Sequence, residues 1–286
     1  MMSAVGFPDQ EDEPLSPHNF DRLTTFIKDY CGIHLTDAKH GMLEGRVRRR
    51  MRAIGITNPN DYCRIVFDEK GPNVESEITH LIDAVTTNKT DFFREATHFD
   101  YLCQKILPEI LASGQRHIKI WSAACSIGAE PYTIAMLLDD FCRKHHGLTY
   151  SVLATDICIQ SLEKALTGRY PEAMVDPVPP DLRRHYVMRS SDPDCHEVRM
   201  SPKLRSNIAF ARMNLMDEHY PAPRDFDVIF LRNVLIYFDK PTQVKVPAKL
   251  SSHLRVGGYL ILGHSESVRR DGLPLHPVAN TVFQRR

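Results

Sequence analysis

Two short segments of the sequence place small or acidic side chains where a ligand could reach them. Residues 121–132 read Trp-Ser-Ala-Ala-Cys-Ser-Ile-Gly-Ala-Glu-Pro-Tyr, a run of small residues that would let a ligand approach the backbone. Asp156 ends a strand-like run, and a carboxylate at that point often accepts hydrogen bonds from a ribose diol. Close packing would also explain the small residues, and a helix N-cap would also explain Asp156, so both explanations stay open here.

Two further segments combine polar and aromatic side chains. Arg232, Asn233 and Tyr237 follow closely after a wholly apolar run, and a binding site explains that change better than packing does. Residues 86–95, Thr-Thr-Asn-Lys-Thr-Asp-Phe-Phe-Arg-Glu, form a polar stretch with paired aromatics, which also suits an ordinary capped connector. The loop at 121–132 lacks the Gly-x-Gly-x-x-Gly fingerprint, so a diphosphate dinucleotide is disfavoured as the ligand.

The apolar periodicity predicts the elements that would position these segments. Helical periodicity runs from Ser16 to about Ala96, and short β-rich runs then alternate with helices. In the first part we expect helices between Pro17 and Gly32 and at 37–54, 61–67 and 75–85. In the second part we expect helices at 98–112, 130–143, 157–166 and 241–254, and strands at 118–123, 150–155, 226–231, 258–263 and, along an edge, 278–286. This rhythm predicts an α/β fold with a doubly wound parallel sheet.

The chain divides into parts of different character. Prolines and acidic residues in 1–15 indicate a disordered tail, and residues 16–86 indicate an all-helical domain. A linker at 87–97 leads into the α/β domain at 98–286. Within that domain, a proline-rich stretch at about 170–207 interrupts the rhythm, and we expect a small β insertion there.

The composition narrows the class of protein. Lysine plus arginine equals aspartate plus glutamate, at 36 each, so the whole chain has no bias towards nucleic acid or anionic membranes. No apolar run approaches the roughly 20 residues that span a bilayer, and no signal peptide is visible at the start. The seven cysteines are scattered without a Cys-x-x-Cys pair, which suits reduced thiols. We therefore expect a cytoplasmic protein without direct membrane insertion.

One local patch of charge stands out in the helix expected at 37–54. It carries five arginines, Arg46, Arg48, Arg49, Arg50 and Arg52. A purely solubilising face would explain some of them, but five exceed what an ordinary face with balanced charge carries. The functional interpretation is docking on an acidic helix.

Six motifs in a fixed order point to a known family. They are Thr-Thr-Asn-x-Thr-x-Phe-Phe-Arg-Glu, Trp-Ser-Ala-Ala-x-Ser-x-Gly-x-Glu-Pro-Tyr, Ala-x-Asp, Asn214-Leu215 after Phe210, Arg-Asn-Val-x-Ile-Tyr-Phe and Gly263-His264-Ser265-Glu266. Together they resemble the chemotaxis receptor methyltransferases of the CheR type, and the likeness covers about 20–283. The resemblance implies a helical N-terminal domain, a linker that lines a cofactor site, and a Rossmann-like S-adenosylmethionine-dependent methyltransferase domain with a three-stranded antiparallel insertion.

The resemblance also implies roles for particular residues. The implied cofactor-binding residues are Asn88, Thr90 and Arg94 from the linker, Glu130 and Asp156 for the methionine and ribose ends, and Asn214, Leu215, Arg232 and Asn233. Tyr237 would stand near the reacting methyl group, and Arg94 would hold a carboxylate of the acceptor or of the cofactor. Relatives usually carry glutamate where this chain has Ala129, but Glu130 is kept, so we expect binding to survive.

The activity implied is transfer of a methyl group to glutamate carboxylates on cytoplasmic helices of chemotaxis receptors, which leaves S-adenosylhomocysteine and serves adaptation. Arg46, Arg49, Arg50 and Arg52 would dock those glutamate-rich helices. We expect a monomer. A methyltransferase acting on another acidic protein and a non-catalytic interaction module remain alternatives. The neutral charge, the lack of aromatics among the arginines and the lack of an Asn/Asp-Pro-Pro-Tyr/Phe segment disfavour nucleic acid as partner or substrate.

Overall fold

The computed structural model describes residues 15–35, 40–68, 71–192, 194–268 and 272–286. The chain forms two compact units, the first built from residues up to Tyr30 and from His34 to Thr86, and the second from Cys31–Ile33 and Thr87–Arg286. Residues 1–14 of the expected disordered tail lie outside the described residues. Leu15, the last residue of that expected tail, is buried, and its N–H donates to Glu44 Oε1 at 3.3 Å.

The first unit is built from helices with one apolar stripe each. They are α1 (Pro17–Cys31), α2 (His40–Ala53), α3 (Pro59–Val66) and α4 (Val74–Val85). Leu23, Leu43, Val47 and Leu81 are almost fully buried. Leu43 and Val47 of α2 are four residues apart, which is the spacing of an inward-facing helical stripe. Asn58 caps α3 by accepting the N–H of Asn60 at 2.7 Å, and proline follows Asn58 at the first helical position.

The second unit contains a seven-stranded sheet in the order β6-β2-β1-β7-β8-β10-β9. Its parallel strands are β1 (His117–Ala123), β2 (Thr149–Asp156), β6 (Ile208–Arg212), β7 (Phe226–Leu231) and β8 (Leu254–Leu262). Strand β10 (Val282–Arg285) pairs antiparallel with both β8 and β9 (Leu275–Ala279). This mostly parallel sheet confirms the expected α/β fold class.

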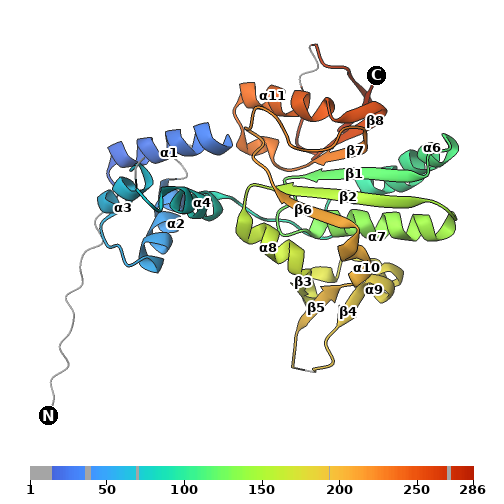
Figure 1. The fold of residues 1–286 in the computed structure, drawn as a ribbon, viewed down its shortest axis with the longest axis horizontal. Coiled ribbons are helices and arrows are strands. Elements are labelled where there is room, and N and C mark those ends of the chain that lie inside the picture. Colours follow the sequence, from blue (N-terminus) through green and yellow to red (C-terminus); the bar gives the residue numbers. More distant parts are fainter. Residues whose placement is uncertain (1–14, 36–39, 69–70, 193, 269–271) are drawn as a thin grey trace. The chain divides into compact units, whose positions relative to one another are not determined.

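Helices cover both faces of this sheet, because successive side chains of a strand point to opposite faces and both sets are apolar. Val228 and Phe230 of β7 join one buried cluster, while Ile229 and Leu231 join the other. The first cluster includes α5 (Thr97–Tyr101), α6 (Leu107–Ala112) and α7 (Ala129–Lys144), and the second includes α11 (Lys240–Ser251). Figure 1 shows α7 and α11 on opposite sides of the sheet.

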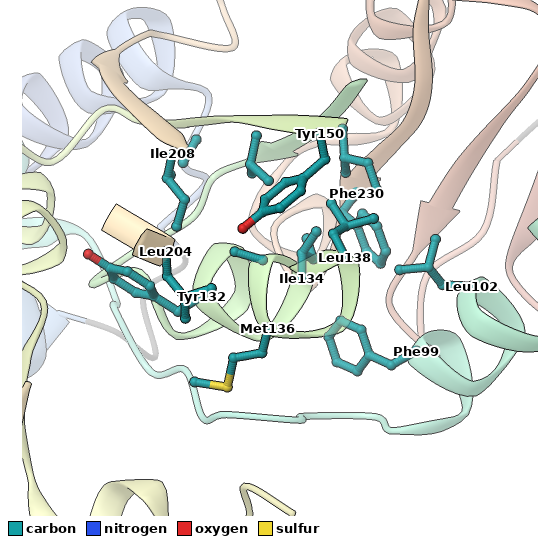
Figure 2. Packing of buried hydrophobic residues seen from close by; sticks show 14 of the residues in the cluster. Phe99, Leu102, Tyr132, Ile134, Met136, Leu138, Tyr150, Leu204, Ile208 and Phe230 are labelled. Carbon is teal, nitrogen blue, oxygen red and sulfur yellow. The ribbon is translucent and has the colours of Figure 1, made fainter. Parts of the chain in front are cut away.

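Figure 2 shows the packing of the first cluster, where Ile134 and Leu138 of α7 lie beside Phe230 of the sheet. Leu102 also belongs to this cluster and is fully buried. Fully burying an aliphatic or aromatic side chain of this size contributes about 1.5 to 3 kcal/mol. The strands β1 and β7 therefore lie in a well-packed core from which the site loops extend.

The proline-rich interruption forms a separate three-stranded antiparallel sheet in the order β3-β5-β4, as expected. Its strands are β3 (Arg169–Pro171), β4 (Val187–Arg189) and β5 (Glu197–Met200), and it also contains η3 (Glu172–Val175), α9 (Pro180–Tyr186) and α10 (Pro202–Ser206). It follows α8 (Ile159–Thr167), and the chain returns to the large sheet as β6.

One expectation about a single element was wrong, and a second was confirmed with one added detail. The segment expected as one edge strand at 278–286 belongs to a hairpin, in which β10 pairs with β8 and the edge is β9. Thr281 has φ 53°, which lets the chain turn between the two strands. The single helix expected at 98–112 contains a π-helical turn, η2 (Leu102–Ile106). Pro108 lacks an N–H and would crowd the carbonyl four residues earlier, which accounts for a wider turn there.

Two expectations drawn from composition can be compared with the structure. All seven cysteines are free, as the scattered spacing indicated. Among the described residues, no helix combines the length and the apolar character that a membrane crossing needs.

Candidate active site

Polar residues gather where the parallel strands end. Strands β6, β2, β1, β7 and β8 are neighbours and run parallel, so their carboxyl ends meet along one edge of the sheet. Three non-glycine residues in the loops at this edge have left-handed backbones, Ala124 (φ 63°), Ser126 (φ 52°) and Asn233 (φ 57°). Such conformations cost on the order of 1 kcal/mol or more each and persist only where neighbouring groups enforce them. Those neighbouring groups define the site.

The Asp156 carboxylate holds the loop that follows β1. Its Oδ2 accepts the N–H of Ser126 at 2.7 Å, and its Oδ1 accepts the N–H of Cys158 at 2.9 Å. Asp156 is buried, and it is not the N-cap residue of α8, a position that Cys158 occupies. A carboxylate oxygen is a strong hydrogen-bond acceptor, so a carboxylate at this position suits a ligand hydroxyl.

The linker before α5 packs against the same two loops. Asn88 donates from Nδ2 to Cys158 Sγ at 3.4 Å, and its carbonyl accepts the hydroxyl of Ser126 at 3.0 Å. Arg94 donates to the carbonyl of Lys89 at 3.0 Å, which closes the linker on itself. Of the linker residues expected at the site, Asn88 therefore contacts the loops that follow β1 and β2.

Arg232 is the centre of a buried ion-pair network next to this linker. Its guanidinium lies 3.0 Å from Glu95 Oε2 and 3.0 Å from Glu130 Oε2, and it also donates to the carbonyl of Arg94. Glu130 accepts the Ser122 hydroxyl with its other oxygen at 2.7 Å. The network joins the linker, the start of α7 and the loop after β7.

Glu95 and His98 have shifted pKa values in this network. Burial alone would raise the pKa of Glu95, but hydrogen bonds from Asn233 and Arg232 and the Arg232 charge outweigh it and lower the pKa to about 2. Burial and the Arg232 charge lower the pKa of His98 to about 4. His98 bonds Thr281 Oγ1 through Nε2 at 2.8 Å, and its Nδ1 lies 3.6 Å from Glu95 Oε2. Glu95 is therefore an anion and His98 is neutral at neutral pH.

A second buried carboxylate, Glu266, fixes the loop after β7. Its two oxygens accept the N–H groups of Asn233, Leu235 and Gly263 at 2.7 to 2.8 Å. Burial raises the pKa of Glu266, although these backbone hydrogen bonds act to lower it. Gly263 has no room for a side chain, because an added Cβ would lie 2.7 Å from Asn233 Nδ2.

The remaining predicted site residues lie on neighbouring loops. Asn214 follows β6 and accepts the N–H of Met216 with its side chain at 2.9 Å, while Leu215 is buried. Tyr237 is half-buried in the short η4 turn (Leu235–Tyr237), and Thr90 is half-buried in the linker. The part that these four residues play in the site stays a prediction.

Glu95 and Glu266 belong to two of the sequence motifs, but the sequence predicted no role for either residue. It also missed Ser122 and Ser126, whose side chain or backbone contacts Glu130 and Asp156. An acidic residue beside a strand end or in a polar linker could have indicated these roles. The sequence interpretation applied that signal to Asp156 alone.

The arginines of α2 divide into two groups. Arg46 donates to the carbonyl of Thr86 at 3.2 Å, Arg48 pairs with Glu44 at 2.8 Å, and Arg50 pairs with the buried Glu77 at 2.7 Å. Arg49 and Arg52 are exposed. Three of the five arginines therefore already bond groups of the first unit.

Comparisons with known proteins show the family of the chain. The family model described as the CheR methyltransferase all-alpha domain matches 18–86, and that described as the CheR methyltransferase SAM binding domain matches 88–282. A chemotaxis protein methyltransferase of Borreliella burgdorferi is 38% identical over 261 residues, which cover 89% of this chain and 90% of that protein. Its counterpart in Escherichia coli strain K12 is 37% identical over 253 residues, which cover 88% of this chain and 85% of that protein.

A solved TehB-like SAM-dependent methyltransferase from Corynebacterium glutamicum aligns with 68% of this chain and 100% of its own, at 14% identity and a TM-score of 0.36, a likeness too weak to add evidence. The sequence matches confirm the resemblance drawn from the motifs. The chain therefore belongs to the CheR family of chemotaxis protein methyltransferases, and residues 88–282 are its S-adenosylmethionine-binding domain.

Proposed function

We propose that this enzyme transfers methyl groups from S-adenosylmethionine to glutamate side chains on the cytoplasmic helices of chemotaxis receptors. The methyl esters that result would adjust receptor signalling during adaptation, and the enzyme would act as a cytoplasmic monomer. The observation that carries the proposal is the gathering of Asp156, Glu130, Arg232 and Asn233 at the carboxyl edge of a CheR-family sheet.

The residues at this edge suit S-adenosylmethionine chemically. The cofactor carries an ammonium group and a ribose diol, which are hydrogen-bond donors, and Glu130 and Asp156 offer carboxylate oxygens as acceptors. Its carboxylate needs a cation, and Arg94 retains guanidinium N–H groups beyond the one bonded to Lys89. Ala129 is fully buried at the first residue of α7, beside the retained Glu130, so we expect binding to tolerate it.

The reaction needs alignment more than proton transfer. Bound S-adenosylmethionine supplies an electrophilic methyl group on a sulfonium centre. A glutamate acceptor has a reference pKa of about 4.3, so it is already the anionic nucleophile at neutral pH and no general base is required. We assign Arg94 to the carboxylate of the cofactor or of the acceptor, and Tyr237 to orienting the acceptor, because a well-oriented pair of reactants removes much of the entropic barrier.

The contacts of the α2 side chains favour two of the four proposed docking arginines. Arg46 and Arg50 are committed to Thr86 and Glu77, while Arg49 and Arg52 project into solvent. We therefore propose that Arg49 and Arg52 make most of the contribution to binding a glutamate-rich receptor helix. Exposed charges of this kind raise the association rate and specify the partner more than they raise affinity.

Methyl transfer to purified receptors tests the proposed function. The enzyme is incubated with S-adenosylmethionine labelled in its methyl group and a panel of receptor cytoplasmic domains. We expect base-labile label on glutamate residues of at least one receptor, and none when those glutamates are replaced by alanine. If the enzyme binds the cofactor tightly but labels no receptor in the panel, the proposed substrate class is wrong.

A further inference from the structure

We propose that Glu266 is a positioning residue that sets the cofactor-side loop after β7 into its binding conformation. The proposal rests on the assignment of Arg232 and Asn233 to the cofactor pocket. It adds a residue that would touch neither the cofactor nor the acceptor, and that would act through the backbone of residues 233–235.

The contacts of Glu266 are concentrated on this loop. It accepts the N–H of Asn233 at 2.8 Å and the N–H of Leu235 at 2.7 Å, and it joins them to the N–H of Gly263 at the end of β8. The two strands that precede these loops, β7 and β8, are direct neighbours in the sheet. One side chain thus ties two adjacent loops together at the edge where the ligand is expected.

The loop needs such a tie because its conformation is strained. Asn233 has φ 57°, and this backbone turns its side chain to Glu95, where Nδ2 donates to Oε1 at 3.0 Å. Glu95 in turn pairs with Arg232 at 3.0 Å. Releasing the Asn233 backbone would therefore disturb both the Asn233 side chain and the ion pair that places Arg232 beside Glu130.

A buried carboxylate at the other end of β7 offers a matched comparison. Asp227 is fully buried, pairs with Arg255 Nε at 2.6 Å and accepts the backbone N–H of Lys119 at 2.8 Å. It lies near the start of β7, whereas Asn233 and Leu235 follow its end. Both carboxylates support the same strand, but only Glu266 bonds the loop at the carboxyl edge. A purely structural role would make the two equivalent for ligand binding.

The test compares Glu266→Gln and Glu266→Asp with Asp227→Asn. Glutamine keeps one acceptor oxygen but turns an NH₂ group towards backbone donors, while aspartate keeps the charge on a shorter side chain. Calorimetric titration with S-adenosylhomocysteine gives cofactor affinity, and urea unfolding gives stability. We expect Glu266→Gln to weaken binding at least tenfold, Glu266→Asp to restore part of it, and Asp227→Asn to lower stability with binding within twofold of wild type.

Two results would overturn the proposal. One is a folded Glu266→Gln protein with wild-type cofactor affinity, and the other is a loss of cofactor affinity in Asp227→Asn as large as that in Glu266→Gln. Hydrogen exchange of the wild-type protein gives a test that needs no variant. The Asn233, Leu235 and Gly263 amides should exchange slowly without ligand, and unprotected exchange rates there would also overturn the proposal. These readouts use no receptor, so they stand even if the proposed glutamate substrate is wrong.

Discussion

The two compact units differ in the burial and pairing of their arginines. Arg232 is buried, and its guanidinium meets two carboxylates, one from the linker and one from the start of α7. Arg49 and Arg52 of α2 are exposed and lie among arginines that already have partners. A buried, paired arginine fixes the geometry around it, because moving it would leave its carboxylates unpaired. An exposed arginine fixes no local geometry and can respond to an approaching acidic surface.

The largest effect should follow from removing the buried arginine. Arg232→Met leaves Glu95 and Glu130 without their cation, and breaking a buried pair in this way costs about 3 to 5 kcal/mol. We expect a drop of that size in the free energy of unfolding, measured with urea, together with loss of S-adenosylmethionine binding.

Arg50→Met is the control within the first unit. It breaks a similar pair with the buried Glu77, so stability should fall while cofactor affinity stays unchanged. If Arg50→Met weakened cofactor binding as much as Arg232→Met, the contrast between the two regions would fail.

The next effect is a pH dependence that arises beside Arg232. His98 faces Arg232, His264 and Glu95, and burial together with the Arg232 charge lowers its pKa from the ordinary 6.5 to about 4 in the folded state. Because the folded pKa is depressed, His98 contributes stability that is present above pH 6.5 and is lost as pH falls towards 4. At about 1.4 kcal/mol per pH unit, the difference of 2.5 sets an upper bound of about 3 kcal/mol.

Urea unfolding at several pH values checks this effect. Wild-type stability should decline between pH 6.5 and 4, and His98→Gln should show a flatter profile in that window. The Glu95 carboxylate affects stability in a lower pH range, because its stabilising contribution is lost only as pH falls from 4.5 towards its pKa of about 2. An unchanged slope in His98→Gln would place the titrating group elsewhere.

An intermediate effect is expected at Asp156. Asp156→Ala removes the acceptor of two backbone N–H groups and the proposed ribose contact, and a hydrogen bond to a charged group contributes about 1.5 to 3 kcal/mol. Calorimetry should show weaker cofactor binding by this amount in a folded protein. Asp156→Asn, which keeps one acceptor oxygen, should lie between wild type and alanine, and equal affinity in all three would refute the ribose assignment.

The smallest effects should come from the exposed arginines. Each exposed charge pair contributes about 0.2 to 1 kcal/mol and is screened within roughly 8 Å at physiological ionic strength. The double variant Arg49→Ala/Arg52→Ala should methylate receptor more slowly and lose most of its salt dependence, with stability and cofactor affinity as in wild type. Each single variant should lower the methylation rate only slightly. A double variant with the wild-type rate and salt response would show that Arg49 and Arg52 do not dock the receptor.

Local pattern in the sequence predicted the scaffold well. The short β-rich runs became β1, β2, β7 and β8, because runs of this length bounded by turn signals and alternating with helices favour strands. The hairpin of β9 and β10 was missed because its turn, Asn280-Thr281, lacks the glycine of common hairpin turns.

The site was predicted in part, and the missing part is long-range. Asp156 and Arg232 could be picked out because each stands beside a strand end. The roles of Glu95 and Glu266 depend on partners far along the chain, such as Arg232, which is 137 residues from Glu95. No periodicity records such a pairing. The Arg50–Glu77 pair could not be predicted for the same reason, so the sequence offered no ground for separating the arginines of α2 that are paired from those that are exposed.

The hairpin at the end of the chain also protects the large sheet from unwanted association. An open sheet edge exposes a row of N–H and C=O groups that can recruit another strand. Here the edge strand β9 is only five residues long and carries Pro277 at its centre, opposite Phe283 of β10. Proline has no N–H to donate, so the edge cannot offer a continuous ladder to a second chain. At the β9 edge, the last strands thus limit the growth of the sheet by addition of further strands.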